Sequence, residues 1–322
     1  MSDESPLVSF VLATYNRPDD LTDAIDAILE QRYEPFEIVV VSNSTDETGD
    51  LFQAGGKFDH PRIHYHEFDG RMGVPKARNV GFDLADGDIL VTTDDDAELT
   101  DPGATRELVS LFRENEDVGV IAFQSRSYHT GEPILMEIPD PPIRGTPSSQ
   151  QYRASSFCGV GNAIRRDMLE DVGAYAADFV YGFEEHDLSL RLLDAGWDIL
   201  YAPSVEVYHK QTPKARLPST ETRERQIANR IKLAVRNLPW RYVLFTTLIW
   251  TVYGLVTAKF DPRSVRRVLE MVYEERTSLR ENRDVVDAQT ITRLKSRGTL
   301  LFAWWFGPDP RRIIENPRRL TW

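Results

Sequence analysis

Three consecutive carboxylates, Asp94, Asp95 and Asp96, follow a short apolar segment at 89–91. The segment comes after a Gly-Asp pair and contains β-branched residues, which predicts a strand that ends at the carboxylates. Successive side chains of a strand point to opposite faces, so Asp94 and Asp96 are expected on one side and Asp95 on the other. Two charges about 4 Å apart repel by about 1 kcal/mol even in water, and a cation would relieve that repulsion. The triplet therefore predicts a Mg²⁺ or Mn²⁺ site, and a solvated acidic turn is the alternative.

A second acidic cluster, Glu184-Glu185-His186-Asp187, opens a predicted helix at 184–195. Acidic residues at a helix N-terminus are common, because each one stabilises the helix by about 0.3–1 kcal/mol through its dipole. By itself the cluster is therefore structural more often than catalytic. A carboxylate placed beside a substrate hydroxyl can also act as a general base. The presence of the Asp triplet in the same chain favours the catalytic interpretation.

The elements that must position these acids alternate along the first third of the chain. Strands are predicted at 8–13, 36–41, 62–66, 89–93 and 118–123. Helices are predicted between them, beginning at 18, at 75 and at 100–102. Such alternation predicts an α/β fold with a Rossmann-like, mostly parallel sheet sandwiched by helices. Ligands of such sheets bind beyond the carboxyl ends of the strands, where the Asp triplet lies.

The next part of the chain is less regular. Residues 124–156 are rich in Pro, Ser and Gly, which predicts a long surface excursion over the site. A short helix is predicted near 165–171, before the acidic helix. Strands are predicted after that helix, at 197–201 and 205–209.

The composition is that of a globular protein, with 41% hydrophobic and 28% charged residues among 322. The single cysteine excludes an internal disulfide and indicates a reducing compartment. The net charge of −13 is uneven, because residues 1–212 carry −24 and residues 213–322 carry +11. A basic C-terminal region indicates contact with an anionic surface. Lysines are also scarce, 7 against 31 arginines, and an acid excess with few lysines is typical of a high-salt cytoplasm.

The basic C-terminal region contains an uncharged segment, 242–258, with arginines and lysines on both sides. As a helix it would be about 25 Å long, which is short of the ~30 Å hydrocarbon core of a bilayer. The flanking charges show no asymmetry of the kind expected for a crossing helix. A second apolar patch, 299–306, contains Trp304 and Trp305. We expect an interfacial attachment, with a true span and a buried helix as the alternatives.

Five segments in this chain resemble the family 2 glycosyltransferases of the GT-A fold. They are 8–17, 42–46, 73–79, 94–96 and 184–191, and the resemblance covers about residues 7–212. Each segment alone is a weak signal, but five in the family's order at plausible spacings are a strong one. The resemblance implies an inverting enzyme that uses a nucleotide-sugar donor and a divalent cation. Together with the charge distribution, it divides the chain into a GT-A glycosyltransferase domain at 1–212 and a helical membrane-associated region at 213–322.

The resemblance also implies roles for individual residues. Glu185 matches the general base, although the family often has Asp there, and Glu184 is the alternative base. Asp96 matches the metal ligand and Asp94 the acid near the ribose, and His209 matches a place where some members add a metal or diphosphate contact. The residues expected at the donor or the metal are Thr14, Tyr15, Asn43, Arg71, Arg78, Asp94, Asp96 and His209.

The identity of the nucleotide depends on the end of the second strand. Family members commonly have Asp there to accept a hydrogen bond from the base, whereas this chain has Ser42 and Asn43. The amide oxygen of Asn43 can still accept a hydrogen bond from a uracil N–H, so UDP is the favoured nucleotide. The Gln-x-x-Arg-Trp signature of processive members is absent after the acidic helix, which favours transfer of a single sugar.

The acceptor is predicted from the C-terminal region. A basic, aromatic and apolar attachment beside a sugar-transfer site indicates a membrane surface and a lipid-linked acceptor, a polyprenyl or dolichyl phosphate glycan. With its high-salt composition, the chain is similar to archaeal enzymes that extend the lipid-linked glycan for protein N-glycosylation. We expect it at the cytoplasmic face of the cell membrane, and we expect no nucleic-acid partner.

Three other classes of protein are the alternatives. A transferase-like binding or scaffold subunit without activity would tolerate the altered Ser42 and Asn43. A sugar nucleotidyltransferase shares the sheet but opens with a Gly-rich basic loop, which residues 13–18 do not resemble. A phosphatase of the haloacid dehalogenase type has its Asp-x-Asp motif at the first strand and needs a later lysine, and lysines are scarce here.

Overall fold

The computed structural model describes residues 5–70, 72–139, 149–213, 219–257 and 261–297. Its centre is a nine-stranded sheet in the order β3-β2-β1-β4-β8-β6-β9-β5, with β7 paired to β9. The strands are β1 (Val8–Thr14), β2 (Phe36–Ser42), β3 (Ile63–Glu67), β4 (Ile89–Asp94), β5 (Ala97–Leu99), β6 (Val118–Ser127), β7 (Tyr152–Ala154), β8 (Gly161–Arg165) and β9 (Asp198–His209). The helices are α1 (Pro18–Leu29), α2 (Val74–Leu84), α3 (Ala104–Glu114), α4 (Arg166–Val172), α5 (Glu184–Asp194), α6 (Ser219–Asn237), α7 (Trp240–Thr257), α8 (Pro262–Glu274), α9 (Arg276–Glu281) and α10 (Ala288–Arg297), with short 3-10 turns η1 (Glu47–Phe52) and η2 (Ala177–Phe179).

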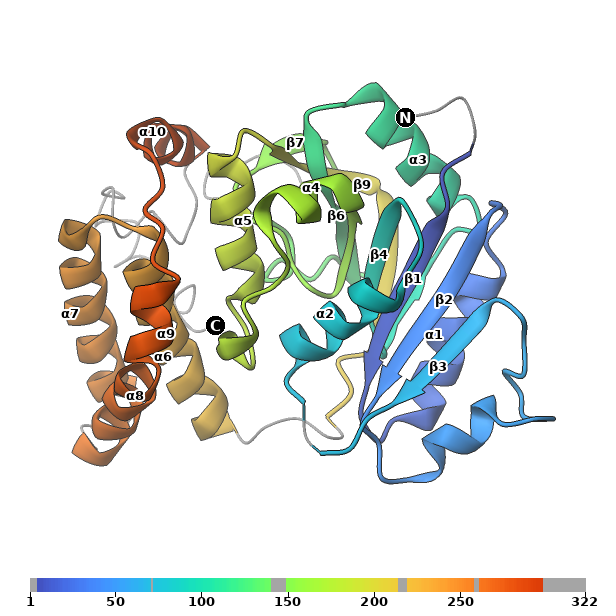
Figure 1. Cartoon of the computed structure of the whole chain (residues 1–322), viewed down its shortest axis with the longest axis horizontal. Helices are drawn as coiled ribbons and strands as arrows, with labels where there is room; N and C mark the ends of the chain where they lie inside the picture. Colours follow the sequence, from blue (N-terminus) through green and yellow to red (C-terminus); the bar gives the residue numbers. More distant parts are fainter. Residues whose placement is uncertain (1–4, 71, 140–148, 214–218, 258–260, 298–322) are drawn as a thin grey trace.

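The sheet has a parallel half and a mixed half. Strands β3, β2, β1 and β4 run parallel, and β8 lies antiparallel between β4 and β6. Strand β9 runs parallel to β6, and β5 and β7 are antiparallel to β9. Helices lie on both sides of this sheet, which confirms the predicted α/β fold (Figure 1).

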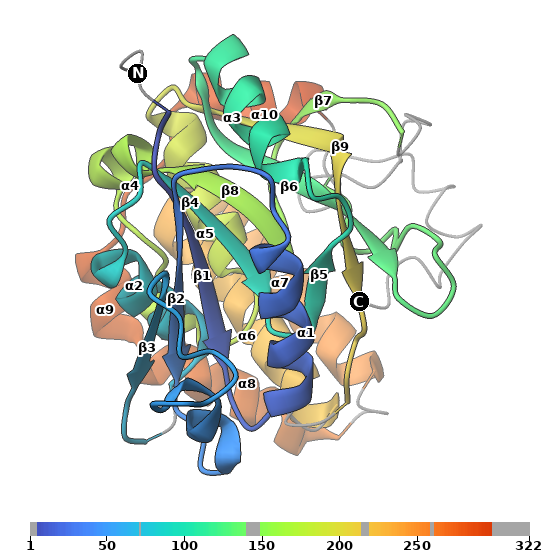
Figure 2. The same cartoon turned by 90° about the vertical axis from the view of Figure 1, so that its right-hand side faces the viewer.

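Alternate residues of β1 divide between two hydrophobic cores, as expected for a strand buried on both faces. Phe10 and Leu12 pack with α1 and α3 on one face. Val11 packs with α2, α4 and α5 on the other. Figure 2 shows α1 in front of the sheet and the C-terminal helices behind it.

Two predicted elements differ from the observed ones. The strand predicted at 118–123 continues to Ser127 in β6. The strands predicted at 197–201 and 205–209 form one long strand, β9, that continues past Pro203. The register between β6 and β9 shifts after Phe123, and this irregularity accommodates the residues around the proline. The carboxyl end of β9 is thereby carried to the edge where β4 ends.

The C-terminal helices share a core with the sheet domain. Leu233 and Ala234 of α6, and Leu238 directly after it, are fully buried in the same cluster as Leu188 and Leu192 of α5. The division into two regions at residue 212 stays a prediction. The described parts of the chain before and after this residue nevertheless pack together. Removing α6 would therefore expose apolar surface of α5.

The uncharged segment predicted at 242–258 forms most of α7. One face of α7 packs on α6 through Trp250 and Val243, and the opposite face is exposed at Leu244 and Leu248. None of the helices in the described ranges is long and apolar enough to cross a membrane. The second apolar patch, with Trp304 and Trp305, lies outside the described residues.

Candidate active site

Asp94, Asp96 and His209 meet at one edge of the sheet. Asp94 ends β4, and β5 begins three residues later, where Ala97 pairs with His209 at the end of β9. This pairing places one ligand atom from each of the three side chains within 4.8 Å of the others. His209 Nε2 lies 3.3 Å from Asp96 Oδ1. The cluster thus brings together residues that are 115 positions apart in the chain, from Asp94 to His209.

The surroundings of His209 fit a metal ligand. Its Nε2 is buried and has no hydrogen-bond partner among the described residues. Its Nδ1 lies 2.9 Å from Glu137 Oε2, and a carboxylate that fixes one ring nitrogen is typical of metal-binding histidines. Burial lowers the pKa of His209, but Asp96 and Glu137 outweigh it and raise the pKa to about 10. Two carboxylates and an imidazole are a suitable donor set for a divalent cation, which would displace that proton.

Asp95 faces away from this cluster, as the alternation of β4 predicts. It accepts hydrogen bonds from Thr14 Oγ1 at 2.8 Å and from Arg17 Nη1 at 2.9 Å. Burial raises the pKa of Asp95 to about 6, although Arg17 and Thr14 act in the opposite direction. For Asp96, burial is outweighed by contacts with His209 and with the backbone N–H of Thr212, so its pKa falls to about 2. Asp95 therefore binds to Thr14 of β1, whereas Asp94 and Asp96 face His209.

Arg78 of α2 connects the Asp triplet to the second acidic cluster. Its Nη2 donates to Asp94 Oδ1 at 2.8 Å and to the carbonyl of Gly159 at 2.7 Å. Its Nη1 lies 3.7 Å from Glu185 Oε1 and has no hydrogen-bond partner in the described parts of the chain. A Cβ at position 159 would overlap Glu185 Oε1 and lie 2.5 Å from Arg78 Nη1, so any residue other than glycine there would displace these two side-chain ends. Arg78 was predicted to lie near the donor's nucleobase or diphosphate. In the structure its buried guanidinium lies between Asp94 and Glu185.

Glu184 and Glu185 open α5 side by side with different exposure. Glu184 is buried and its Oε2 has no hydrogen-bond partner among the described residues, whereas the Glu185 side chain is 13% exposed. Burial and the neighbouring Glu185 carboxylate raise the pKa of Glu184. Burial also raises the pKa of Glu185, although Arg78 opposes it. Glu185 is thus the one of the two that a substrate hydroxyl can reach.

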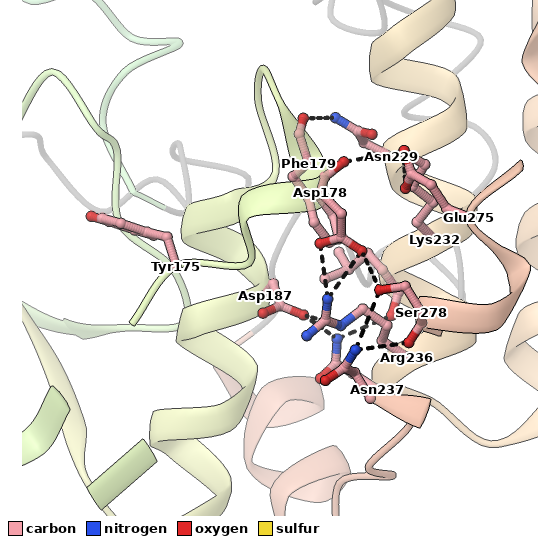
Figure 3. A network of polar contacts seen from close by, with 12 residues as sticks. Tyr175, Asp178, Phe179, Asp187, Asn229, Lys232, Arg236, Asn237, Glu275 and Ser278 are labelled. Atoms are coloured by element: carbon pink, nitrogen blue, oxygen red, sulfur yellow. Dashed lines mark hydrogen bonds and ion pairs between the residues drawn. The ribbon is translucent and has the colours of Figure 1, made fainter. Parts of the chain in front are cut away.

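A polar network behind the acidic helix ties α5 to α6 (Figure 3). The fully buried Asp187 accepts a hydrogen bond from Asn237 Nδ2 at 2.8 Å and lies 3.3 Å from Arg236 Nε. Its other oxygen accepts a hydrogen bond from Arg191 Nε, one turn later on the same helix, at 2.9 Å. Arg236 Nη1 also donates to Asp178 at 3.0 Å. Asp187 is therefore a structural anchor of α5.

Asn229 of α6 holds the loop that leads into α5. Its Nδ2 lies within hydrogen-bond distance of three backbone carbonyls, those of Phe179, Tyr181 and Gly182, at 2.8, 3.0 and 2.8 Å. Two residues of this loop that are not glycine, Val180 and Phe183, have positive φ values of 43° and 77°. Such conformations cost about 1–3 kcal/mol each and persist only where surrounding contacts enforce them. Asn229 supplies such contacts from the C-terminal region.

The remaining predicted donor residues are placed as follows. Asn43 Nδ2 donates to the carbonyl of Gly70 at 3.0 Å, which leaves its Oδ1 as an acceptor. Tyr15 is half-buried just after β1. Arg71 lies outside the described residues. The roles of these residues and of Thr14 in nucleotide binding stay predictions.

Comparison with known proteins gives a consistent result. The model of the family "Glycosyl transferase family 2" matches residues 9–173. Over its whole length the chain is 24% identical to glycosyltransferase AglE of Haloferax volcanii, of which it covers 98%. A stretch of 113 residues is 32% identical to a glucosyl-dolichyl phosphate glucuronosyltransferase of the same organism, and it covers 34% of this chain and 35% of that one. A further match, 26% identical to the O-antigen biosynthesis protein RfbC of Myxococcus xanthus, covers 66% of this chain and only 18% of that protein.

Solved structures support the same fold. A mannosyltransferase from Pyrobaculum calidifontis, in complex with GDP-Man and Mn²⁺, matches with a TM-score of 0.56 at 18% identity, over 99% of this chain and 88% of that one. GalNAc-T7 with UDP, GalNAc and Mn²⁺ matches with a TM-score of 0.63 at 16% identity, over 91% of this chain and 57% of that one. These likenesses confirm the GT-A fold. Because the family model covers half of the sequence, the chain belongs to glycosyl transferase family 2.

Proposed function

We propose that this protein transfers one sugar from a nucleotide-sugar donor to a hydroxyl of a lipid-linked glycan, with inversion at the anomeric carbon. The observation that carries the proposal is the bridge of Arg78 between two carboxylate sites. On one side of the bridge lie Asp94, Asp96 and His209, and on the other lies Glu185. A donor-binding site and a base are thus held at a fixed separation, as a single displacement requires.

Glu185 acts as the general base in this proposal. The acceptor oxygen attacks the anomeric carbon, its proton passes to Glu185, and the bond to the diphosphate oxygen breaks. Burial raises the pKa of Glu185, which makes the carboxylate a better proton acceptor than an exposed one. Asp94, Asp96 and His209 would hold Mg²⁺ or Mn²⁺, which when bound neutralises charge on the departing nucleoside diphosphate. Arg78 keeps Asp94 and Glu185 in place and has one N–H group without a partner in the described structure.

For the donor we propose a UDP-sugar. Support comes from Asn43, whose NH₂ group is engaged by Gly70, so that its oxygen can accept a hydrogen bond from a uracil N–H. The two similar structures were solved with GDP-Man and with UDP, so both nucleotides belong in the test.

For the acceptor we propose a polyprenyl or dolichyl phosphate-linked glycan at the cytoplasmic face of the cell membrane. Support comes from the outward face of α7, where apolar side chains recur every four residues and are 51–71% exposed. They are Leu244, Leu248, Val252 and Val256. An exposed apolar row beside a basic region is typical of a surface that rests on a membrane. The similarity to a dolichyl phosphate glucuronosyltransferase and the high-salt composition support a role in archaeal protein N-glycosylation.

The test is a transfer assay with purified protein. UDP- and GDP-sugars are offered with a short-chain prenyl phosphate glycan, and products are identified by mass spectrometry and by the configuration of the new bond. Transfer that requires Mg²⁺ or Mn²⁺ and is lost in Glu185→Gln supports the proposal. Donor binding without transfer would indicate the scaffold alternative. Formation of a nucleotide sugar from a sugar phosphate and a nucleoside triphosphate would indicate a nucleotidyltransferase.

A further inference from the structure

One buried arginine differs from the others in its partners. Four arginines in the described part of the chain are buried, namely Arg78, Arg165, Arg230 and Arg236. Arg78 and Arg236 each contact two carboxylates, and Arg165 donates to backbone carbonyls of other elements. Arg230 donates to the carbonyl of Gln226, one turn back in its own helix, at 3.0 Å. Among the described residues it has no carboxylate partner.

The surroundings of Arg230 are aromatic. Its guanidinium carbon lies 4.3 Å from the ring centre of Phe183 and 4.1 Å from that of Trp250, and the residue is 5% exposed. The rings attract the cation, but they do not accept hydrogen bonds from its in-plane N–H groups. A guanidinium has five such donors, and one of them is used. A buried cation with open donors is costly unless an anion binds it.

A second polar group without a partner lies next to this arginine. The ring of His186 packs at a tilt against Phe183, which also contacts the guanidinium, with ring centres 4.8 Å apart. Its buried Nδ1 has no hydrogen-bond partner among the described residues. Burial and the charge of Arg230 lower the pKa of His186 to about 4, so the ring is neutral at pH 7. A neutral imidazole can donate one hydrogen bond to an anion beside the guanidinium.

We propose that Arg230 and His186 bind a phosphate group of the lipid-linked acceptor. This inference deepens the proposed function and rests on it. The planar guanidinium fork matches phosphate oxygens, and charge-assisted hydrogen bonds of this kind are among the strongest in proteins.

The position of the pair agrees with such a substrate. Phe183, which both side chains contact, directly precedes Glu184 and Glu185, so the anion would sit beside the base. Trp250 belongs to α7, whose opposite face carries the exposed row at Leu248 and Val252. A phosphate at Arg230 would therefore lie between the sugar, directed to Glu185, and the prenyl chain, directed to the apolar row.

The test compares two acceptors that differ in the phosphate alone. One is a glycan on a short prenyl phosphate, and the other is the same glycan on a neutral alkyl chain. In Arg230→Met, which keeps the bulk and removes the charge, we expect the KM for the phosphate acceptor to rise about 10- to 100-fold. The KM for the neutral acceptor should stay within about twofold, and Arg230→Lys should recover part of the loss. Arg225→Gln, which removes a partly exposed charge that is paired with Glu221 on the same helix, is the matched control.

An equal loss with both acceptors would overturn the inference and leave Arg230 as a packing residue. Direct binding of farnesyl phosphate, farnesol and inorganic phosphate to the wild-type protein is the second measurement, and it does not depend on transfer. We expect farnesyl phosphate to bind at least about 10-fold more tightly than either of the others. Equal binding of farnesol would exclude a phosphate site, and equal binding of inorganic phosphate would indicate an adventitious anion. Absence of transfer to any acceptor would refute the proposed function, while the same binding measurement, made also on Arg230→Met, would still test the phosphate site.

Discussion

The contact between Arg78 and Glu185 can be opened by a single methyl group. The change is Gly159→Ala, whose Cβ would overlap Glu185 Oε1 and lie 2.5 Å from Arg78 Nη1. Real Cβ contacts are essentially never below 3.0 Å, so the two side-chain ends must move apart. Both are ends of flexible side chains, and we therefore expect little loss of folding stability. The perturbation acts on the distance between the donor site and the base.

The size of the effect follows from that displacement. Restoring ordinary van der Waals contact moves Glu185 by about 1 Å, and a misplacement of this size can reduce turnover about 10²-fold. We expect kcat to fall by about that factor, while the Kd for the nucleotide, measured by calorimetry, changes little. Gly49→Ala is the matched control, because its added Cβ would meet Tyr65 at an ordinary 3.4 Å.

A double variant distinguishes misplacement of the base from other damage. If Glu185 is the group displaced, Gly159→Ala should cost much less in a Glu185→Gln background than in the wild type. A kcat for Gly159→Ala within about threefold of the wild type would refute the reasoning. So would full additivity with Glu185→Gln, because the methyl group would then act through another residue.

Four further predictions concern the base, the metal and the membrane. Glu185→Gln should lose about 10²–10⁴ in turnover and still bind nucleotide. A larger loss of turnover in Glu184→Gln would show that Glu184, and not Glu185, is the general base. Because the pKa of Glu185 is raised and its ionised form is needed, wild-type kcat/KM should fall as pH decreases through a value above 4.5, which a pH–rate profile measures. Asp96→Asn and EDTA should each abolish transfer without lowering Tm by more than a few degrees, and normal activity of Asp96→Asn at saturating metal would contradict the metal site. Leu248→Glu with Val252→Glu should release the protein from anionic vesicles in a flotation assay without loss of activity on a neutral soluble acceptor, and unchanged flotation would contradict the apolar row.

The parts of the site that the sequence predicts depend on the spacing of residues within one strand or one helix. The alternation of β4 was sufficient to place Asp95 apart from Asp94 and Asp96, because a strand has a period of two. The ion pair of Asp187 and Arg191 is likewise local, because residues four positions apart lie on the same face of a helix. His209 was predicted through the resemblance alone, since a histidine at a strand end carries no signal of its own.

The unpredicted residues act through contacts between distant segments. Glu137 lies in the Pro-rich excursion, and its contact with His209 spans 72 positions. Asn229 lies in α6, whose sequence is rich in charged residues, yet its amide binds a loop 47–50 positions earlier. For α7 the sequence shows no charged face, and the face that is buried is determined by packing against α6. Such positions depend on the folded neighbours of a residue, which periodicity does not encode.

The anchoring of α5 by α6 also fixes when the enzyme can become active during its synthesis. The ribosome makes the strands and the acidic helix first. The chain up to His209 therefore already contains the proposed general base and every proposed ligand of the cation. Asp187 is then still without Arg236 and Asn237, and the loop before Glu184 is still without Asn229. Nascent chains would therefore hold a sheet and a donor site before they hold a positioned base. Helix α6, which supplies these contacts, and helix α7, which carries the apolar row, follow one another in the chain, so the proposed base would be positioned at the same stage of synthesis at which the proposed membrane-binding face is made.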